Sequence, residues 1–297
     1  PPEHTVTLDQ VRQRDRSVPL IIADGMGVDS TAMLLVLKAH AIRPNLILFA
    51  DTGGEKPETY QYIELRRAWL AASGFPPLVV LRYTPKKVPD RTLEDQCLRT
   101  KTLPSLAYGG KSCSLKWKVA PQNRYCARWE PALWCWQAGK KPIKAIGYDA
   151  GKSDGRRIKI WNDGKYVYWY PLKELGLDRD ACKRLIADAG LREPPKSACW
   201  FCPASKKAEL QWLERQHPDL VLRALAIEEN AMAKLRTVKG LGRRFSWKEY
   251  LQGEGAVDEG SDRTVAPIRT PGHNHERLLA EGKEVGHVLG CLAPATG

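Results

Sequence analysis

The sequence predicts an α/β protein with a Rossmann-like parallel β-sheet flanked by helices and a mainly helical C-terminal extension. Two observations predict this class. Short apolar runs alternate with longer segments whose apolar residues recur at helical spacing. The spacing between the runs is typical of right-handed βαβ units, in which each helix returns the next strand parallel to the last. A chain of 297 residues can hold one large domain, or one domain with a smaller appendage.

The predicted elements follow in a regular order. The first three strands are expected at 18–23, 44–50 and 76–83, with helices between them at 29–42 and 58–74. Asp29 or Ser30 can cap the first helix, and Gly74 ends the second. Further strands are expected at 142–149 and 165–172, a helix at 178–190, and a long helical stretch at 206–236 with a break at Pro218.

Three parts are expected along the chain: a polar tail at 1–17, the domain that carries the sheet at 18–215, and a helical and loop-rich extension at 216–297. Within the extension, residues 253–274 are rich in Gly, Pro, Asp and Thr and are expected to be loop or partly disordered. No internal repeat is evident.

Charge and composition narrow the function classes. The formal net charge of +13 favours a polyanionic partner such as a nucleotide, sulfate or nucleic acid, and a solvated basic surface is the alternative. No stretch approaches the roughly 18 apolar residues of a membrane helix. The polar N-terminus lacks a signal-peptide core, so we expect a cytoplasmic protein with no membrane partner. In that compartment the eight cysteines indicate metal binding, redox chemistry or burial.

The stretch GMGVDS, residues 25–30, joins the first predicted strand to the first helix. Gly25 and Gly27 allow a tight turn and a close approach of a ligand to the backbone. The first amides of the helix and its dipole favour an anion there, and Ser30 can add a hydroxyl donor. The pattern is neither a Walker A motif nor the Rossmann fingerprint. A phosphate cradle and a plain structural turn are therefore both open.

Several ordered segments between Pro19 and Leu213 resemble motifs of the N-type ATP pyrophosphatase superfamily. GMGVDS is similar to its PP-loop, Ser-Gly-Gly-x-Asp-Ser. DTGGEKPETY, at 51–60, resembles the Asp-Thr-Gly…Pro-Glu-Thr signature of the phosphoadenosine phosphosulfate (PAPS) reductase branch. The segments SCSLKWKVAP, AIGYDAGKSDGRR, YPLKEL and CWFC follow in the order of that branch. The resemblance implies an adenine nucleotide alpha hydrolase-like fold. It also suggests kinship with phage or mobile-element, CRISPR-associated and DNA phosphorothioation proteins.

The sequence departs from the branch at chemically important positions. Gly25 replaces the first Ser of the PP-loop, Met26 replaces one of its Gly residues, and Asp24 adds a negative charge beside the loop. Tyr148 stands where an Arg near the sulfonucleotide is expected. The reductases carry their catalytic thiol in a C-terminal Glu-Cys-Gly, for which this chain offers only Cys291 in LGCLAP. These departures favour nucleotide binding over sulfonucleotide reduction.

The resemblance implies that ATP or PAPS binds beyond the carboxyl ends of the strands. The residues implied to bind the nucleotide are Gly25, Met26, Gly27, Asp29, Ser30, Asp51, Thr52, Gly53, Lys118, Arg124 and Gly147. Lys116, Arg156 and Arg157 are the implied catalytic cations, because Lys and Arg with Mg²⁺ can stabilise charge on a leaving pyrophosphate. The alternative for Asp29 is a helix cap, and the alternative for each cation is ordinary surface charge.

The segment CWFC is a Cys-x-x-Cys pair, which can hold zinc or an iron–sulfur cluster or form a redox disulfide. A metal needs about four ligands. Cys199 and Cys202 supply two, Cys113 is the third by resemblance, and Cys97 is the best fourth. A buried dithiol without metal is the alternative. The remaining cysteines that we expect to be packing residues are Cys126, Cys135 and Cys182.

Three functions are consistent with these features. The first is ATP cleavage between the α and β phosphates, which would activate a substrate for sulfur transfer from a sulfur donor. The second is PAPS reduction with thioredoxin. The third is a nucleic-acid-binding accessory role, since residues 234–248 carry six basic and no acidic side chains, and Phe245 and Trp247 could stack on bases. A solvated helix end is the alternative for that segment. The acceptor and the oligomeric state stay open.

Overall fold

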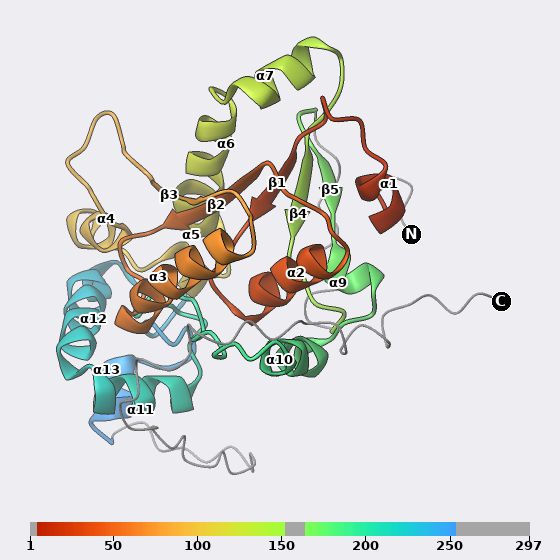
Figure 1. The fold of residues 1–297 in the computed structure, drawn as a ribbon. Coiled ribbons are helices and arrows are strands. Elements are labelled where there is room, and N and C mark those ends of the chain that lie inside the picture. The colour runs from red at the N-terminus through yellow and green to blue at the C-terminus, as the bar shows by residue number, and fades with distance from the viewer. Residues whose placement is uncertain (1–4, 152–163, 254–297) are drawn as a thin grey trace.

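The computed structural model describes residues 5–151 and 164–253 (Figure 1). Its centre is one parallel sheet with the strand order β3-β2-β1-β4-β5. The strands are β1 (Leu20–Ala23), β2 (Leu46–Asp51), β3 (Leu78–Arg82), β4 (Ile143–Ile146) and β5 (Val167–Trp169). The predicted Rossmann-like parallel α/β class is confirmed, and each predicted strand is present.

Successive side chains of a strand point to opposite faces of the sheet. Both faces of this sheet are apolar, and helices cover each of them. One face packs Ile22, Ile47 and Phe49 against α2 (Val28–Ala39) and α3 (Pro57–Ala72). Two shorter helices, α9 (Pro171–Glu174) and α10 (Arg179–Asp188), extend that layer. The opposite face packs Ile21, Leu46 and Leu48 against Cys126 of α6 (Ala120–Cys126). Figure 1 shows α2 and α3 in front of the strands, with α7 (Glu130–Gln137) projecting beyond them.

A second hydrophobic core lies beside the sheet. It joins α4 (Leu93–Thr100) to α11 (Lys207–Gln216), α12 (Pro218–Ala231) and α13 (Trp247–Leu251), which gather on one side of the molecule in Figure 1. The predicted break at Pro218 is confirmed as the start of α12. The expected boundary after residue 215 falls inside this core, because α11 and α12 share it. The predicted loop at 253–274 lies outside the described residues, apart from Gly253.

The described N-terminal residues differ from the expected polar tail. Thr5 forms a parallel bridge with Tyr168, next to β5. The short helix α1 (Leu8–Arg12) is capped by Thr7, and its Val11 is completely buried in the main core. One apolar residue per helical turn is enough to anchor this segment, and a single such residue gives no visible periodicity in the sequence.

Glu228 of α12 holds the basic segment at 234–248 in place. Its carboxylate is 1% exposed and accepts hydrogen bonds from the amides of Leu241, Trp247 and Lys248 and from the Ser246 hydroxyl, at 2.5 to 3.0 Å. Trp247 is itself buried, so the expectation that it could stack on bases is wrong. The Trp247 ring packs in the second core. The basic charge pattern of the segment does not reveal this burial.

We expect Glu228→Gln to lower the free energy of unfolding by about 1–3 kcal/mol, because the amide group of Gln would face buried donors. Urea denaturation measures this loss. Glu229→Gln is the matched control, since the Glu229 side chain is 63% exposed and pairs only with Lys248 in the described residues. The control should cost less than about 0.5 kcal/mol. Equal losses in the two variants would show that Glu228 does not organise the segment.

Within the described residues, no helix is long and apolar enough to cross a membrane.

Candidate functional site

The candidate site lies where the sheet order reverses direction. β1 has β2 on one side and β4 on the other, and ligands of parallel α/β sheets bind at such switch points, beyond the carboxyl ends of the strands. The loop from Asp24 to Gly27 leaves β1 there and enters α2. Gly147 follows β4, and a Cβ at this position would lie 3.0 Å from the Asp29 carbonyl oxygen. Gly147 therefore lets the end of β4 approach the first turn of α2 closely.

The glycine loop is open on its outer side. Among the described residues, no atom outside Gly27 and its two chain neighbours lies within 4 Å of the position that a Cβ at Gly27 would occupy. Gly27 has φ −112° and ψ −177°, so its role does not depend on the left-handed region. Ser30 accepts from the Gly27 amide at 3.2 Å and donates to the Gly27 carbonyl at 3.1 Å, which fixes the turn. Since the first amides of a helix have no partner within it, this opening is suited to an anion.

Met26 is the strained residue of the loop, with φ +57° and a fully buried side chain. Its amide donates to Asp24 Oδ1 at 2.8 Å, which stabilises the left-handed turn. The Met26 side chain belongs to the main core, not to the open side of the loop. Its predicted nucleotide contact is therefore limited to the backbone, because the core occupies the side chain.

Asp24 is neutralised inside the protein. Its carboxylate is completely buried, and Oδ2 lies 3.4 Å from Nε of Arg66, whose side chain is 2% exposed. Arg66 comes from α3 and also donates to the Thr31 hydroxyl at 2.5 Å, which ties α3 to α2. The negative charge of Asp24 beside the glycine loop is therefore compensated by Arg66 of α3. A phosphate at Gly27 would not face an isolated carboxylate.

Asp29 forms an ion pair with Arg179 beside the opening of the glycine loop. Its Oδ1 accepts from Nη1 of Arg179 at 2.7 Å, and the Arg179 side chain is 44% exposed. Arg179 is the first residue of α10, which packs on α2. No sequence motif points to Arg179, because its partner Asp29 lies 150 positions away in the chain. This pairing places a guanidinium beside the first turn of α2.

Asp51 ends β2, and its carboxylate is saturated. Oδ2 accepts two hydrogen bonds from Arg82 at 2.7 and 2.9 Å, while Oδ1 accepts from the Gly53 amide at 2.7 Å and the Tyr60 hydroxyl at 2.9 Å. Burial, followed by the Asp51 charge, raises the pKa of Tyr60. The predicted contact of Asp51 with ribose or adenine would require one of these donors to leave. In this structure Asp51 organises the strand ends.

The residues after Asp51 connect the site to the second core. Gly53 has φ +72°, and a Cβ there would lie 2.4 Å from a methyl carbon of Thr92. Thr52 accepts from the Gly54 amide, and its hydroxyl lies 3.1 Å from the sulfur of Cys199. The predicted nucleotide residues Thr52 and Gly53 thus contact α4 and the Cys-x-x-Cys segment. Their packing explains why a glycine is needed at position 53.

The four predicted metal ligands share one neighbourhood. Cys97 and Cys199 are buried in the second core, and Cys113 and Cys202 lie half-buried at its rim. Burial raises the pKa of Cys97 and of Cys199 to about 12, and Cys113 adds to the upward shift at Cys97 and Cys202. These buried thiols are therefore protonated near neutral pH.

The arrangement of these sulfurs does not match a metal site. Among residues 5–151 and 164–253, no group of three or more His, Cys, Asp or Glu side chains is placed to hold a metal ion. The donor type suits zinc or an iron–sulfur cluster, whereas the arrangement does not, so no chemical step below passes through such a group. The three cysteines expected to be packing residues, Cys126, Cys135 and Cys182, are confirmed as completely buried.

Lys118 forms an ion pair beside these cysteines. Its Nζ lies 2.9 Å from Glu55, whose other carboxylate oxygen accepts from Ser197 at 3.1 Å. Burial, the largest single influence, lowers the pKa of Lys118, but the Glu55 carboxylate together with Cys199 and Cys202 raises that pKa overall. Glu55 also pairs its backbone with Cys199 in an antiparallel bridge. Lys118, predicted to bind nucleotide, is committed to Glu55 between the strand ends and the second core.

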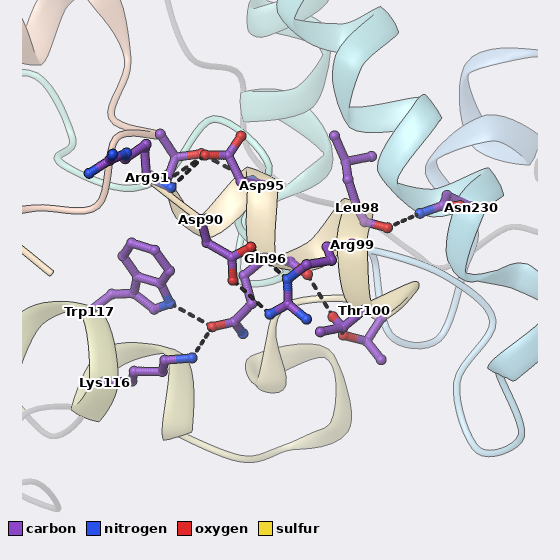
Figure 2. Close-up of polar contacts among 12 residues, drawn as sticks. Asp90, Arg91, Asp95, Gln96, Leu98, Arg99, Thr100, Lys116, Trp117 and Asn230 are labelled. Carbon is purple, nitrogen blue, oxygen red and sulfur yellow. Dashed lines mark hydrogen bonds and ion pairs between the residues drawn. The ribbon is translucent and has the colours of Figure 1, made fainter. Parts of the chain in front are cut away.

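Lys116 and Arg124 lie farther out, around Tyr83 after β3. Lys116 donates to Gln96 at 2.5 Å and sits 5.2 Å from the Tyr83 ring centre, and Arg124 lies 5.0 Å from it. Figure 2 shows Lys116 and Trp117 both pointing at Gln96 of α4, close to the Asp90–Arg99 pair. Within the described residues, the contacts of Lys116 and Arg124 lie outside the glycine loop. The predicted catalytic residues Arg156 and Arg157, and Cys291, lie outside the described residues.

No protein-family model and no curated protein matches the chain. Among solved structures, it is similar to the U34-tRNA thiolase NcsA from Methanococcus maripaludis with its [4Fe-4S] cluster, over 87% of each chain. The TM-score is 0.40 and the identity 13%, a likeness too distant to carry an argument. The strand order and the glycine loop define a Rossmann-like parallel α/β protein with a candidate anion site at the switch point.

Proposed function

We propose that the protein is a PP-loop enzyme that binds ATP at the loop from Gly25 to Ser30. One observation carries the proposal: an open glycine loop lies at the switch point of the sheet, with its neighbouring carboxylate neutralised by Arg66. The basic character of the chain and the resemblance of six ordered segments to motifs of N-type ATP pyrophosphatases support the same nucleotide class.

In the proposed reaction, an oxygen of water or of an acceptor attacks the α-phosphorus of ATP. The bond between the α-phosphorus and the bridging oxygen breaks, and pyrophosphate leaves with its electron pair. ATP is the substrate as its magnesium complex, in keeping with the preference of Mg²⁺ for phosphate oxygens and water over protein cages. The acceptor in a sulfur-transfer reaction would be activated by the adenylyl group. Arg179, at the loop mouth, would bind the phosphates.

The direct test supplies magnesium ATP and measures pyrophosphate and AMP. In parallel, PAPS is supplied with reduced thioredoxin and sulfite is measured. We expect more pyrophosphate than sulfite, because the glycine loop is retained whereas the reductase tail is represented only by Cys291. Sulfite release that disappears in Cys291→Ser would assign the protein to the reductase function instead.

We expect Arg179→Gln to weaken ATP binding about 10-fold or more, since a charged hydrogen bond to phosphate contributes roughly 1.5–3 kcal/mol. The melting temperature should hardly change, because exposed ion pairs stabilise little. Calorimetric titration with ATP measures the affinity. Arg184→Gln, on the exposed side of the same helix, is the matched control and should bind like the parent protein. Equal affinities in both variants would remove Arg179 from the phosphate site.

A further inference from the structure

An open groove of about 960 Å³ lies beyond β3, outside the glycine loop. One wall is the end of β3 with the segment that follows it, and the other is the corner where α6 meets α7. Four cations line it, namely Arg82, Lys86, Arg124 and Arg128, and all four are exposed. The single carboxylate among the lining residues described is Glu130, so the groove is strongly positive.

Three of the four cations, Lys86, Arg124 and Arg128, have no anionic partner among the described residues. Lys86 and Arg128 form no ion pair within the part of the chain that the structure describes. Arg124 stacks near Tyr83 and donates to the Thr84 carbonyl at 3.4 Å, which orients its guanidinium without neutralising it. Arg82 is paired with Asp51, yet its side chain remains 63% exposed. The groove therefore presents charges that are available to an external polyanion.

Two aromatic side chains also line the groove, and we refer to them as its aromatic floor. Tyr125 and Trp129 line the groove and are half-buried against the core that contains Ile21 and Leu48. Rings held by a core lose little conformational freedom when a flat ligand stacks on them. Guanidinium forks that bind phosphate, interleaved with aromatic faces that accept any base, are the combination used for single-stranded nucleic acid.

We propose that this groove binds a single-stranded nucleic-acid segment, with its phosphates on the cations and one base stacked on Tyr125 or Trp129. The groove is open and larger than one phosphate group requires, which suits a chain that enters and leaves. β3 is an edge strand of the described sheet, so an acidic peptide is the competing occupant, but it would leave the aromatic floor without flat partners. The proposal does not depend on ATP cleavage and concerns a surface distinct from residues 234–248.

The test measures fluorescence anisotropy of labelled 12-nucleotide single-stranded RNA and DNA, without ATP, across a salt series. The variant is Lys86→Ala/Arg128→Ala, which removes two of the three cations that have no described ion pair and keeps Arg124, whose guanidinium contacts Tyr83 and Thr84. Each phosphate contact in a single strand contributes about 0.7 to the logarithmic salt slope, so the slope should fall by about 1.4. With equal affinities at 1 M salt, this corresponds to about a 25-fold loss of affinity at 0.1 M salt. Lys173→Ala/Arg184→Ala removes the same charge from α9 and α10 and is the control.

A loss confined to the groove variant supports the proposal, as does weaker binding in Trp129→Leu with an unchanged melting temperature. Equal losses in the groove and control variants would show diffuse attraction to a basic surface and overturn it. Binding of an acidic peptide at this groove, with no binding of either oligonucleotide at 0.1 M salt, would also overturn it and assign the edge strand to a peptide partner.

Discussion

Gly27→Val is expected to reduce ATP affinity at least 100-fold while leaving the fold intact. Apart from the two chain neighbours of Gly27, no described residue has an atom within 4 Å of the position of a Cβ there, so the Cβ of valine meets no described side chain. The backbone of Gly27 is extended, which valine adopts readily. Only a ligand that needs to approach this backbone is therefore excluded. Calorimetric titration of magnesium ATP measures the effect.

Stability must be followed in the same samples. Valine is a poorer N-cap than glycine, so the free energy of unfolding should fall by at most about 1 kcal/mol. Ala71→Val is the matched control, because it adds methyl groups at an exposed position near the far end of α3. The control should bind ATP like the parent. Unchanged ATP affinity in Gly27→Val would show that the nucleotide does not approach the loop there.

Much of the sheet could be predicted from the sequence, because its first strands are short, mainly apolar runs that alternate with strong helical patterns. β1, β2 and β3 with α2 and α3 are of this kind. The second core could not, since α4 is mostly polar and buries only a narrow stripe that includes Leu93 and Cys97. Its packing partners lie more than 100 residues later in the chain, and single-sequence patterns carry no such pairing.

The sequence predicts only the local part of the candidate site, because contacts between distant segments leave no pattern in a single sequence. Local backbone chemistry identified the glycine loop, and the positions of Gly27, Ser30 and Gly147 at one strand-end cluster agree with that prediction. The cations that pair with the carboxylates of the loop, Asp24 and Asp29, come from distant segments of the chain. Arg66 and Arg179 reach the loop from α3 and α10, and neither stands in a recognisable motif. The sequence predicts Lys118 as a nucleotide-binding residue, and no local motif reveals its ion pair with Glu55, 63 positions away.

Arg66→Met is expected to lower the free energy of unfolding by about 3–5 kcal/mol. The substitution leaves the completely buried carboxylate of Asp24 without its cation, and breaking one side of a buried ion pair carries a penalty of this size. Urea denaturation gives the value. Arg67→Met is the control on the same helix, because its side chain is 46% exposed and faces an exposed Glu64, so the cost should be below about 1 kcal/mol.

A second substitution separates charge from packing. Asp24→Asn/Arg66→Met removes both charges, and the Asn carbonyl can still accept from the Met26 amide that Asp24 Oδ1 holds at 2.8 Å. The double variant should regain at least half of the lost stability, because no unpaired charge remains buried. It should also bind ATP more tightly than Arg66→Met, since the loop would again face a neutral group. A double variant no more stable than Arg66→Met would show that the Arg66 side chain acts through packing and its bond to Thr31, and that the charge of Asp24 is of little consequence at the loop.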